Sequence, residues 1–172
     1  NVFHIIPGVE SVPSNTVIKT TSWEIERIHP TNGPAGGGNS TVAGALYTFG
    51  IGSFSATHAY SPYTNSWQVR ADMPTARQGA AVAVLNDRIY VITGAVIGVS
   101  VANEVYTPAT DTWAVLTDIP EGRLGASAAV ASNKIYVLGG NTLNSSKRTD
   151  EYNPITNIWT TKADIPQRRG YS

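Results

Sequence analysis

Hydrophobic and polar residues along the chain fall into short runs of strand-forming side chains separated by polar turns. In AAVAVLNDRIYVITG (80–94) one run of small and branched residues is followed by two polar residues and a second run that ends at Gly94. Two such runs joined by a short polar connection predict a β-hairpin. The segment ASAAVASNKIYVLGG (126–140) repeats the pattern and ends at Gly139-Gly140. The chain is therefore expected to contain hairpins at regular positions.

A period of 46 residues relates these hairpins. Four residue types each occur three times at this spacing: Trp67, Trp113 and Trp159; Tyr60, Tyr106 and Tyr152; Pro74, Pro120 and Pro166; Arg77, Arg123 and Arg169. In the central copy we predict four antiparallel strands, over residues 80–85, 88–93, 102–107 and 112–117. A fainter copy comes first, because Trp23 lies 44 residues before Trp67 and WEIERIHP equals WQVRADMP in length.

The repeat divides the chain into units that carry different numbers of strands. Complete four-stranded units are expected over residues 34–76, 77–122 and 123–168. Residues 1–33 are expected to supply only the second, third and fourth strands of a degenerate unit, and residues 169–172 the start of a further first strand. The fold class is thus all-β, with about three complete units and a partial one at each end.

A unit of this length, with four strands, glycine after the second strand and Tyr and Trp seven residues apart, resembles the kelch repeat of β-propellers, as in the galactose oxidase-like superfamily. The resemblance implies that each unit is one blade, with its first strand lining a central channel and its fourth strand on the rim. It also implies that the recurring aromatic and glycine residues pack the blades: Trp23, Trp67, Trp113, Trp159, Tyr60, Tyr106, Tyr152, Gly94, Gly139 and Gly140. The double glycine occurs only as Gly139-Gly140. At the equivalent positions the sequence has Thr93-Gly94, Phe49-Gly50 and Pro7-Gly8.

An arc of three blades has open ends, because propellers hold 4 to 8 blades. Three interpretations remain: the chain is part of a larger ring, it closes as four blades with residues 169–172 joining the first unit, or it completes a ring by self-association or with another chain. Each provides a partner for blade faces and edge strands that would otherwise be exposed.

Composition excludes several classes of protein. Lys and Arg number 12, and Asp and Glu also number 12. A protein with this balanced charge is not expected to bind nucleic acid or an anionic membrane. No apolar run reaches the length of a membrane helix. Cysteine is absent, which excludes disulfides, thiolate metal sites and the cysteine-dependent copper chemistry that the galactose oxidase resemblance would imply. His4, His29 and His58 lack metal-ligand spacing, so we expect no metal and no cofactor.

The candidate binding residues lie on one face of the predicted blades. We call it the loop face: the loops between second and third strands, and the turns that lead from a fourth strand into the next blade. Arg77, Arg123 and Arg169 occupy these turns and would gather around one mouth, where guanidinium groups bind carboxylates or phosphates. The alternative is that each arginine caps carbonyls or pairs with an acid of a neighbouring blade.

Two loops add further candidates. The loop AVIGVSV (95–101) carries Val96 and Ile97 as a contact patch for a partner, unless the adjacent strands simply run longer there and cover these side chains. Lys147 and Arg148 end the polar loop NTLNSSKR and are either ligand contacts or solvated surface. Acids at Asp72, Asp118 and Asp164 recur two residues before each proline and are expected to cap turns.

These features predict a non-enzymatic binding module that takes a protein or glycan ligand on the loop face. The alternative from the resemblance is a sugar-processing enzyme similar to the kelch-type sialic-acid mutarotases, with one of the arginines and Glu121 in the channel. A third interpretation is an architectural scaffold within a larger surface protein. Low charge with abundant Ser, Thr and Asn favours a secreted, periplasmic or cell-surface location, with the cytoplasm as the alternative.

Overall fold

The computed structural model describes residues 38–42, 44–50, 54–141 and 147–167 of the 172-residue chain. Three sheets, each of four antiparallel strands in sequence order, make up this part of the chain. The first contains β1 (Gly38–Val42), β2 (Ala45–Phe49), β3 (Thr57–Ser61) and β4 (Ser66–Arg70). The second contains β5 (Ala81–Leu85), β6 (Arg88–Ile92), β7 (Asn103–Thr107) and β8 (Thr112–Val115). The third contains β9 (Ser127–Ala131), β10 (Lys134–Leu138), β11 (Thr149–Asn153) and β12 (Ile158–Lys162).

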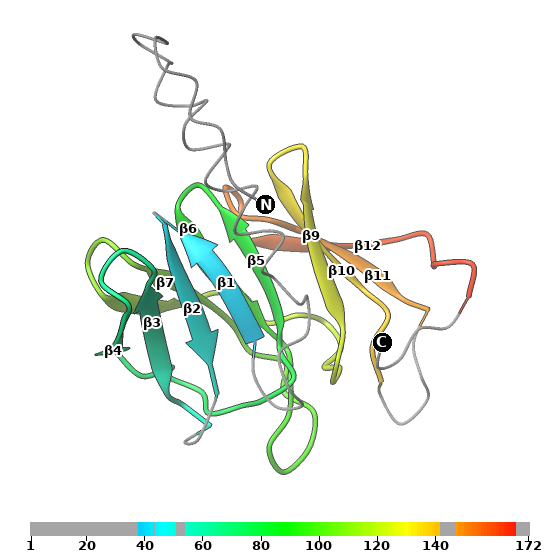
Figure 1. The fold of residues 1–172 in the computed structure, drawn as a ribbon. Helices are drawn as coiled ribbons and strands as arrows, with labels where there is room; N and C mark the ends of the chain where they lie inside the picture. The colour runs from blue at the N-terminus through cyan, green and yellow to red at the C-terminus, as the bar shows by residue number, and fades with distance from the viewer. Residues whose placement is uncertain (1–37, 43, 51–53, 142–146, 168–172) are drawn as a thin grey trace, which may run out of the picture.

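The three sheets are arranged as successive blades. Their first strands β1, β5 and β9 lie next to one another, and the later strands of each sheet fan outward (Figure 1). The polar hairpin connections predicted from sequence have the left-handed backbone that such turns require, with φ of 53° and 56° at Asn86 and Asp87. The all-β fold of four-stranded antiparallel blades is therefore confirmed.

One sheet lies within each of the ranges 34–76, 77–122 and 123–168. The partial units expected at residues 1–33 and 169–172 fall outside the described residues, and so do Trp23, Arg169, His4 and His29.

The hydrophobic core lies between blades rather than within them. Blades 1 and 2 share a cluster that joins Tyr47 and Phe49 to Val91 and Tyr106. Blades 2 and 3 share a second cluster, built on Tyr90, Ile92 and Val105 from one side and on Ile135, Val137 and Tyr152 from the other. Within the described residues, blade 2 therefore has both faces of its sheet covered, and blades 1 and 3 each have one face covered.

The residue that closes the second strand is left-handed in all three blades. Gly50, Thr93 and Gly139 have φ of 73°, 56° and 60°. Tyr47 and Tyr90 occupy the same cross-strand position, opposite Ala59 and Val105, which makes Gly50 the counterpart of Thr93 rather than of Gly94. The sequence pairing of Phe49-Gly50 with Thr93-Gly94 was therefore wrong by one residue, because strand pairing rather than residue identity sets equivalence.

Candidate functional site

The two described arginines of the repeat are buried inside their blades. Arg77 is 1% exposed, and its Nη1 donates to Oε2 of Glu104 at 2.6 Å while Nη2 donates to the carbonyl of Val91 at 2.8 Å. Arg123 is 0% exposed, and its Nη2 donates to Oδ2 of Asp150 at 2.7 Å. In both blades an arginine before the first strand reaches an acid on the third strand, 27 residues later.

The electrostatics of these pairs follow from burial. Desolvation lowers the pKa of Arg77, and the nearby carboxylate of Glu104 opposes the shift. Desolvation likewise lowers the pKa of Arg123, against the effect of Asp150. A guanidinium group stays charged in either case, since its ordinary pKa is so high. The charges are therefore neutralised within each blade.

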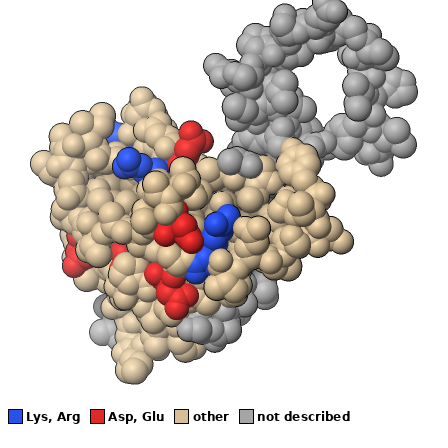
Figure 2. All heavy atoms as spheres, turned by 90° about the vertical axis from the view of Figure 1, so that its left-hand side faces the viewer, with Lys and Arg blue, Asp and Glu red and all other residues tan. Residues whose placement is uncertain are grey.

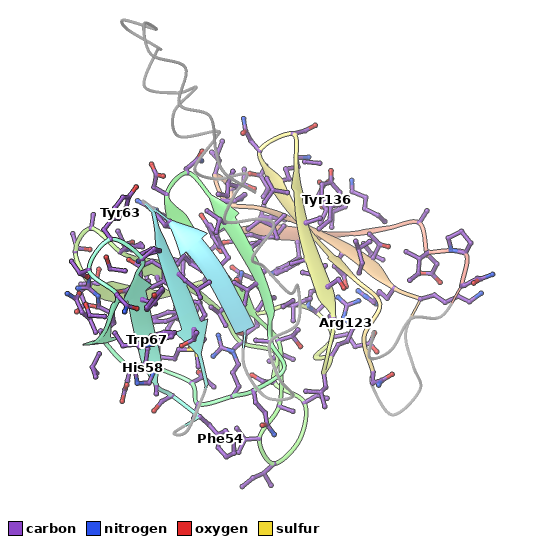
Figure 3. The ribbon with its side chains drawn as sticks, in the orientation of Figure 1. Phe54, His58, Tyr63, Trp67, Arg123 and Tyr136 are labelled. Atoms are coloured by element: carbon purple, nitrogen blue, oxygen red, sulfur yellow. The ribbon has the colours of Figure 1, made fainter. Side chains whose placement is uncertain are left out.

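This geometry corrects the expectation of an open arginine mouth for Arg77 and Arg123. A buried guanidinium whose donors already hold a carboxylate and backbone carbonyls has no exposed face to offer a ligand. The alternative of ion pairing holds, with the difference that the acid belongs to the third strand of the same blade. Figure 3 shows Arg123 among the side chains of blade 3, below the label of Tyr136. Arg169 lies outside the described residues.

The loop face is held together by backbone hydrogen bonds that repeat in each blade. The amide of the residue after each recurring aspartate donates to a loop carbonyl of the same blade: Met73 to Ser55, Ile119 to Val101 and Ile165 to Lys147, at 2.8, 3.0 and 2.8 Å. Within the described residues, Asp72 accepts a long bond from the hydroxyl of Ser55, at 3.5 Å. The turns are therefore fixed by the backbone, and the expected capping by Asp72 is not the bond that closes its turn.

The apolar loop 95–101 is exposed. Strand β6 ends at Ile92 and β7 begins at Asn103, so longer strands do not cover this loop, and that alternative is wrong. Ile97 is 100% exposed, and Val96, Val99 and Val101 are also exposed. The sequence therefore identified Val96 and Ile97 correctly as surface residues.

Backbone hydrogen bonds hold the loop and connect its neighbour Gln78, through Arg77, to Phe54 of blade 1. Ala95 exchanges two backbone hydrogen bonds with Gln78, and the amide of Ser100 donates to Gly94 at 2.7 Å. The amide of Arg77, next to Gln78, donates to the carbonyl of Phe54 at 2.7 Å. Phe54 is itself exposed. We call Phe54, Val96, Ile97, Val99 and Val101 the apolar loop patch.

The polar loop end in blade 3 presents a small charged group. The Arg148 guanidinium donates to Oδ2 of Asp150 at 2.7 Å and to Oε2 of Glu121 at 3.5 Å. Asp150 raises the pKa of Arg148 through that hydrogen bond. Lys147 donates to the carbonyl of Pro166 at 3.1 Å. Both candidate cations thus have protein partners, and Glu121 pairs with Arg148 rather than with buried Arg123.

Other chemistry finds little support in the described ranges. Among these residues no group of three or more His, Cys, Asp or Glu is placed to hold a metal ion. The same part of the chain has no helix long and apolar enough to cross a membrane. On the side of the molecule where β4 lies, Lys and Arg sit beside Asp and Glu in small mixed groups on a mostly uncharged surface (Figure 2).

Comparison with known proteins bears on the fold. A family model of the kelch motif matches residues 122–166, from the turn before β9 to the turn after β12. The fold is that of a kelch-type β-propeller. A solved structure described as "Structure of YjhT" is similar with a TM-score of 0.70 at 20% sequence identity, over 79% of this chain and 53% of that chain. This chain therefore spans about half the length of that structure. No curated protein matches the chain in sequence.

Sequence reasoning missed three residues of these kelch blades. Glu104 and Asp150 both lie two residues before a repeat tyrosine, but one is Glu, the other Asp, and His58 takes the position in blade 1. A search for one recurring residue type could not find them, whereas a search for recurring charge would have found two. Phe54 gave no signal, because its exposure depends on where the loop lies.

Proposed function

We propose that this kelch propeller segment is a non-enzymatic binding module that takes a protein partner on the apolar loop patch. The observation that carries the proposal is the full exposure of Ile97 in a loop held by backbone hydrogen bonds on both sides. Binding residues commonly lie on loops that a rigid scaffold positions. A loop already ordered before binding loses less conformational entropy when a partner docks.

The chemistry of the patch favours a protein over a glycan. Its exposed side chains are Phe and branched aliphatic groups, which bury well against apolar protein surface. A glycan needs polar side chains that converge on its hydroxyls, and the arginines first considered for that task are buried in ion pairs. The chemistry of the patch therefore favours an apolar protein segment as its ligand.

A peptide library displayed on phage and selected on the folded 172-residue protein tests this proposal. Ile97→Asp should weaken the binding of the selected peptides by at least about tenfold, because a central apolar anchor dominates such interfaces. The matched control is Ile155→Asp, an equally drastic change at a residue 89% exposed in the turn between β11 and β12. That turn belongs to the opposite end of the blades, as Tyr63 and Phe54 illustrate for blade 1 in Figure 3.

Two results would overturn the proposal. One is that the selected peptides bind the Ile97→Asp variant as tightly as the original protein. The same holds if the Ile155→Asp control weakens peptide binding as much as Ile97→Asp does. The other is binding of sugars detected by saturation-transfer NMR with a panel that includes sialic acid, lost in Arg148→Met. That second result would favour the sugar-processing alternative, with half-buried Arg148 and Glu121 as the accessible pair instead of Arg123 and Glu121.

A further inference from the structure

Neighbouring blades are joined by a hydrogen-bonded clamp on a single backbone unit. The amide of Ala71 in blade 1 donates to Oδ1 of Asp111 at 2.9 Å, and its carbonyl accepts from Nε1 of Trp113 at 2.8 Å. Blade 3 holds the backbone of Thr117 in blade 2 with the same two bonds. Its amide donates to Oδ1 of Asn157 at 2.9 Å, and its carbonyl accepts from Nε1 of Trp159 at 2.8 Å. We call this pair of bonds the backbone clamp.

The clamp side chains are held in place by the blade that carries them. Asp111 and Asn157 are left-handed turn residues, and each accepts a hydrogen bond from the tyrosine five residues earlier, Tyr106 or Tyr152. The same tyrosine contacts the clamp tryptophan, with ring centroids 5.1 Å apart in blade 2 and 4.9 Å apart in blade 3. The blade that carries the clamp therefore positions both clamp side chains through its own contacts.

Blade 1 carries the same clamp without an occupant among the described residues. Asn65 is left-handed and accepts from the Tyr60 hydroxyl at 2.8 Å, and the Tyr60 and Trp67 rings lie 5.1 Å apart. Trp67 is 55% exposed, and Val69 beside it on β4 is also exposed. In Figure 3 the labels of Trp67 and His58 mark this side of blade 1. Within the described residues, no backbone unit bridges the Trp67 indole N–H and the Asn65 amide oxygen as Ala71 and Thr117 do in the occupied clamps.

Sequence spacing identifies the occupant. Each clamped residue lies four positions after the tryptophan of its own blade and three before the proline, as in Trp67, Ala71 and Pro74. The segment Trp23–Pro30 reproduces both intervals and places Arg27 at the clamped position. Strand β5 begins seven residues after Pro74, and β1 begins eight residues after Pro30. The link from Pro30 to β1 is therefore at least as long as the link from Pro74 to β5. It is long enough for residues 23–30 to pack on blade 1 in the way that blade 1 packs on blade 2.

We propose that the open face of blade 1 is the docking site for residues 23–30 of the same chain, with the backbone of Arg27 held by Asn65 and Trp67. The Arg27 amide donates to Asn65 and its carbonyl accepts from the Trp67 indole. A second copy of the chain offers a competing occupant. Its Ala163 lies four residues after Trp159, which is the clamped position of blade 3. Tethering favours the segment of the same chain, since its local concentration is high at any dilution.

Amide hydrogen exchange of the intact chain, followed by NMR, tests this assignment. The Arg27 amide should be protected at every protein concentration. Asn65→Gly keeps the left-handed turn but removes the acceptor, and it should speed Arg27 exchange roughly fivefold, the ratio that one net hydrogen bond supports. Asn157→Gly is the matched control, which should speed exchange at Thr117 and leave Arg27 unchanged.

Trp67→Phe provides a second variant that keeps an aromatic ring and removes the indole donor. It should also speed Arg27 exchange. The proposal is overturned if the Arg27 amide exchanges at the unprotected rate in the original protein, or if Asn65→Gly and Asn157→Gly affect it equally. Protection of Ala163 that is lost on dilution, with Arg27 unprotected, would overturn it in favour of a second copy.

Discussion

Arg77 and Glu104 form an ion pair in which both side chains are almost completely buried, with Nη1 and Oε2 2.6 Å apart. The pair spans the blade from the turn before β5 to β7. Arg123 and Asp150 repeat it in blade 3, but there Asp150 also accepts from Arg148 at 2.7 Å and from the Thr161 hydroxyl at 3.1 Å. The two pairs therefore differ in what remains when the arginine is removed.

Arg77→Met should destabilise the protein more than Arg123→Met. Removing Arg77 leaves Glu104 buried without a cation, and breaking a buried pair costs about 3–5 kcal/mol. Removing Arg123 leaves Asp150 with Arg148 and Thr161, so the penalty should be smaller. Urea unfolding of the two variants measures the difference.

The double variant Arg77→Met, Glu104→Leu is the control for this prediction. Replacing both partners by apolar groups removes the unpaired charge, and stability should recover most of the loss. Equal destabilisation by Arg77→Met and Arg123→Met, or no recovery in the double variant, would contradict the account.

The strands and blades could be predicted from sequence because their determinants recur as identical residues. Tyr106 and Trp113 stack within the blade, and Trp113 also reaches Ala71 in the preceding blade. A residue that serves both a blade and its neighbour is needed in every copy, and its period is visible in one sequence. These contacts give Tyr106 and Trp113 the packing role expected of the recurring aromatic residues.

The role of the arginines could not be decided from sequence. Recurrence of Arg77 and Arg123 fits both a ligand mouth and an internal pair, and only burial separates them. Their acids vary in type, and blade 1 has His58 at this position with no arginine three residues after Pro30. Both partners are absent there together, as expected when either one buried alone would be costly.

The original protein, with Thr93, should be more stable to unfolding than either its Thr93→Gly or its Thr93→Val variant. A β-branched residue at φ of 56° is strained, but the Thr93 hydroxyl accepts from the Arg123 amide and donates to carbonyl oxygen of Arg123 or Ser100. Thr93→Val keeps the strain and leaves the Arg123 amide without its partner, at a cost of about 1–3 kcal/mol. Thr93→Gly loses the same bonds but relieves about 1–2 kcal/mol of left-handed strain.

Thermal unfolding of the three proteins should therefore rank threonine first, glycine second and valine last. The rank of glycine above valine is the informative part, because valine retains more of the buried side chain. A valine variant as stable as the original would mean that the hydroxyl bonds contribute nothing.

Acid should weaken blade 3 through Glu151. Lys134, Tyr136 and Lys162 surround its carboxylate, and hydrogen bonds from Lys134 and Tyr136 lower the pKa of Glu151 from 4.5 to about 2. A depressed folded pKa stabilises the protein above the unfolded value, and this contribution is lost as pH falls from 4.5 toward 2. Glu151→Gln should therefore lose less stability than the original protein over that interval.

Urea unfolding at both ends of the interval measures this effect. Glu121→Gln is the control, an acid at 44% side-chain exposure with one long contact to Arg148, and it should leave the acid dependence nearly unchanged. An unchanged acid dependence in Glu151→Gln would exclude Glu151 as the responsible group.

Alkali should destabilise the blades through Tyr106 and Tyr152. Burial raises the pKa of Tyr152 from 10.0 to about 12, and burial together with the hydrogen bond to Asp111 raises the pKa of Tyr106 further. A raised folded pKa stabilises the protein fully below the unfolded value of 10.0, and the contribution is lost as pH rises toward the folded pKa. Unfolding free energy should therefore fall above pH 10.

Asp111 and Asn157 make the origin of the difference testable, because they occupy the same position of the clamp. Asp111→Asn keeps an acceptor for the Tyr106 hydroxyl and the Ala71 amide but removes the negative charge, so the pKa of Tyr106 should fall. Asn157→Asp is the reverse change and should raise the pKa of Tyr152. Spectrophotometric titration of tyrosinate in both variants measures the shifts. If both substitutions move the tyrosine pKa in the same direction, charge at this position is not the cause, and a change in burial would have to explain it.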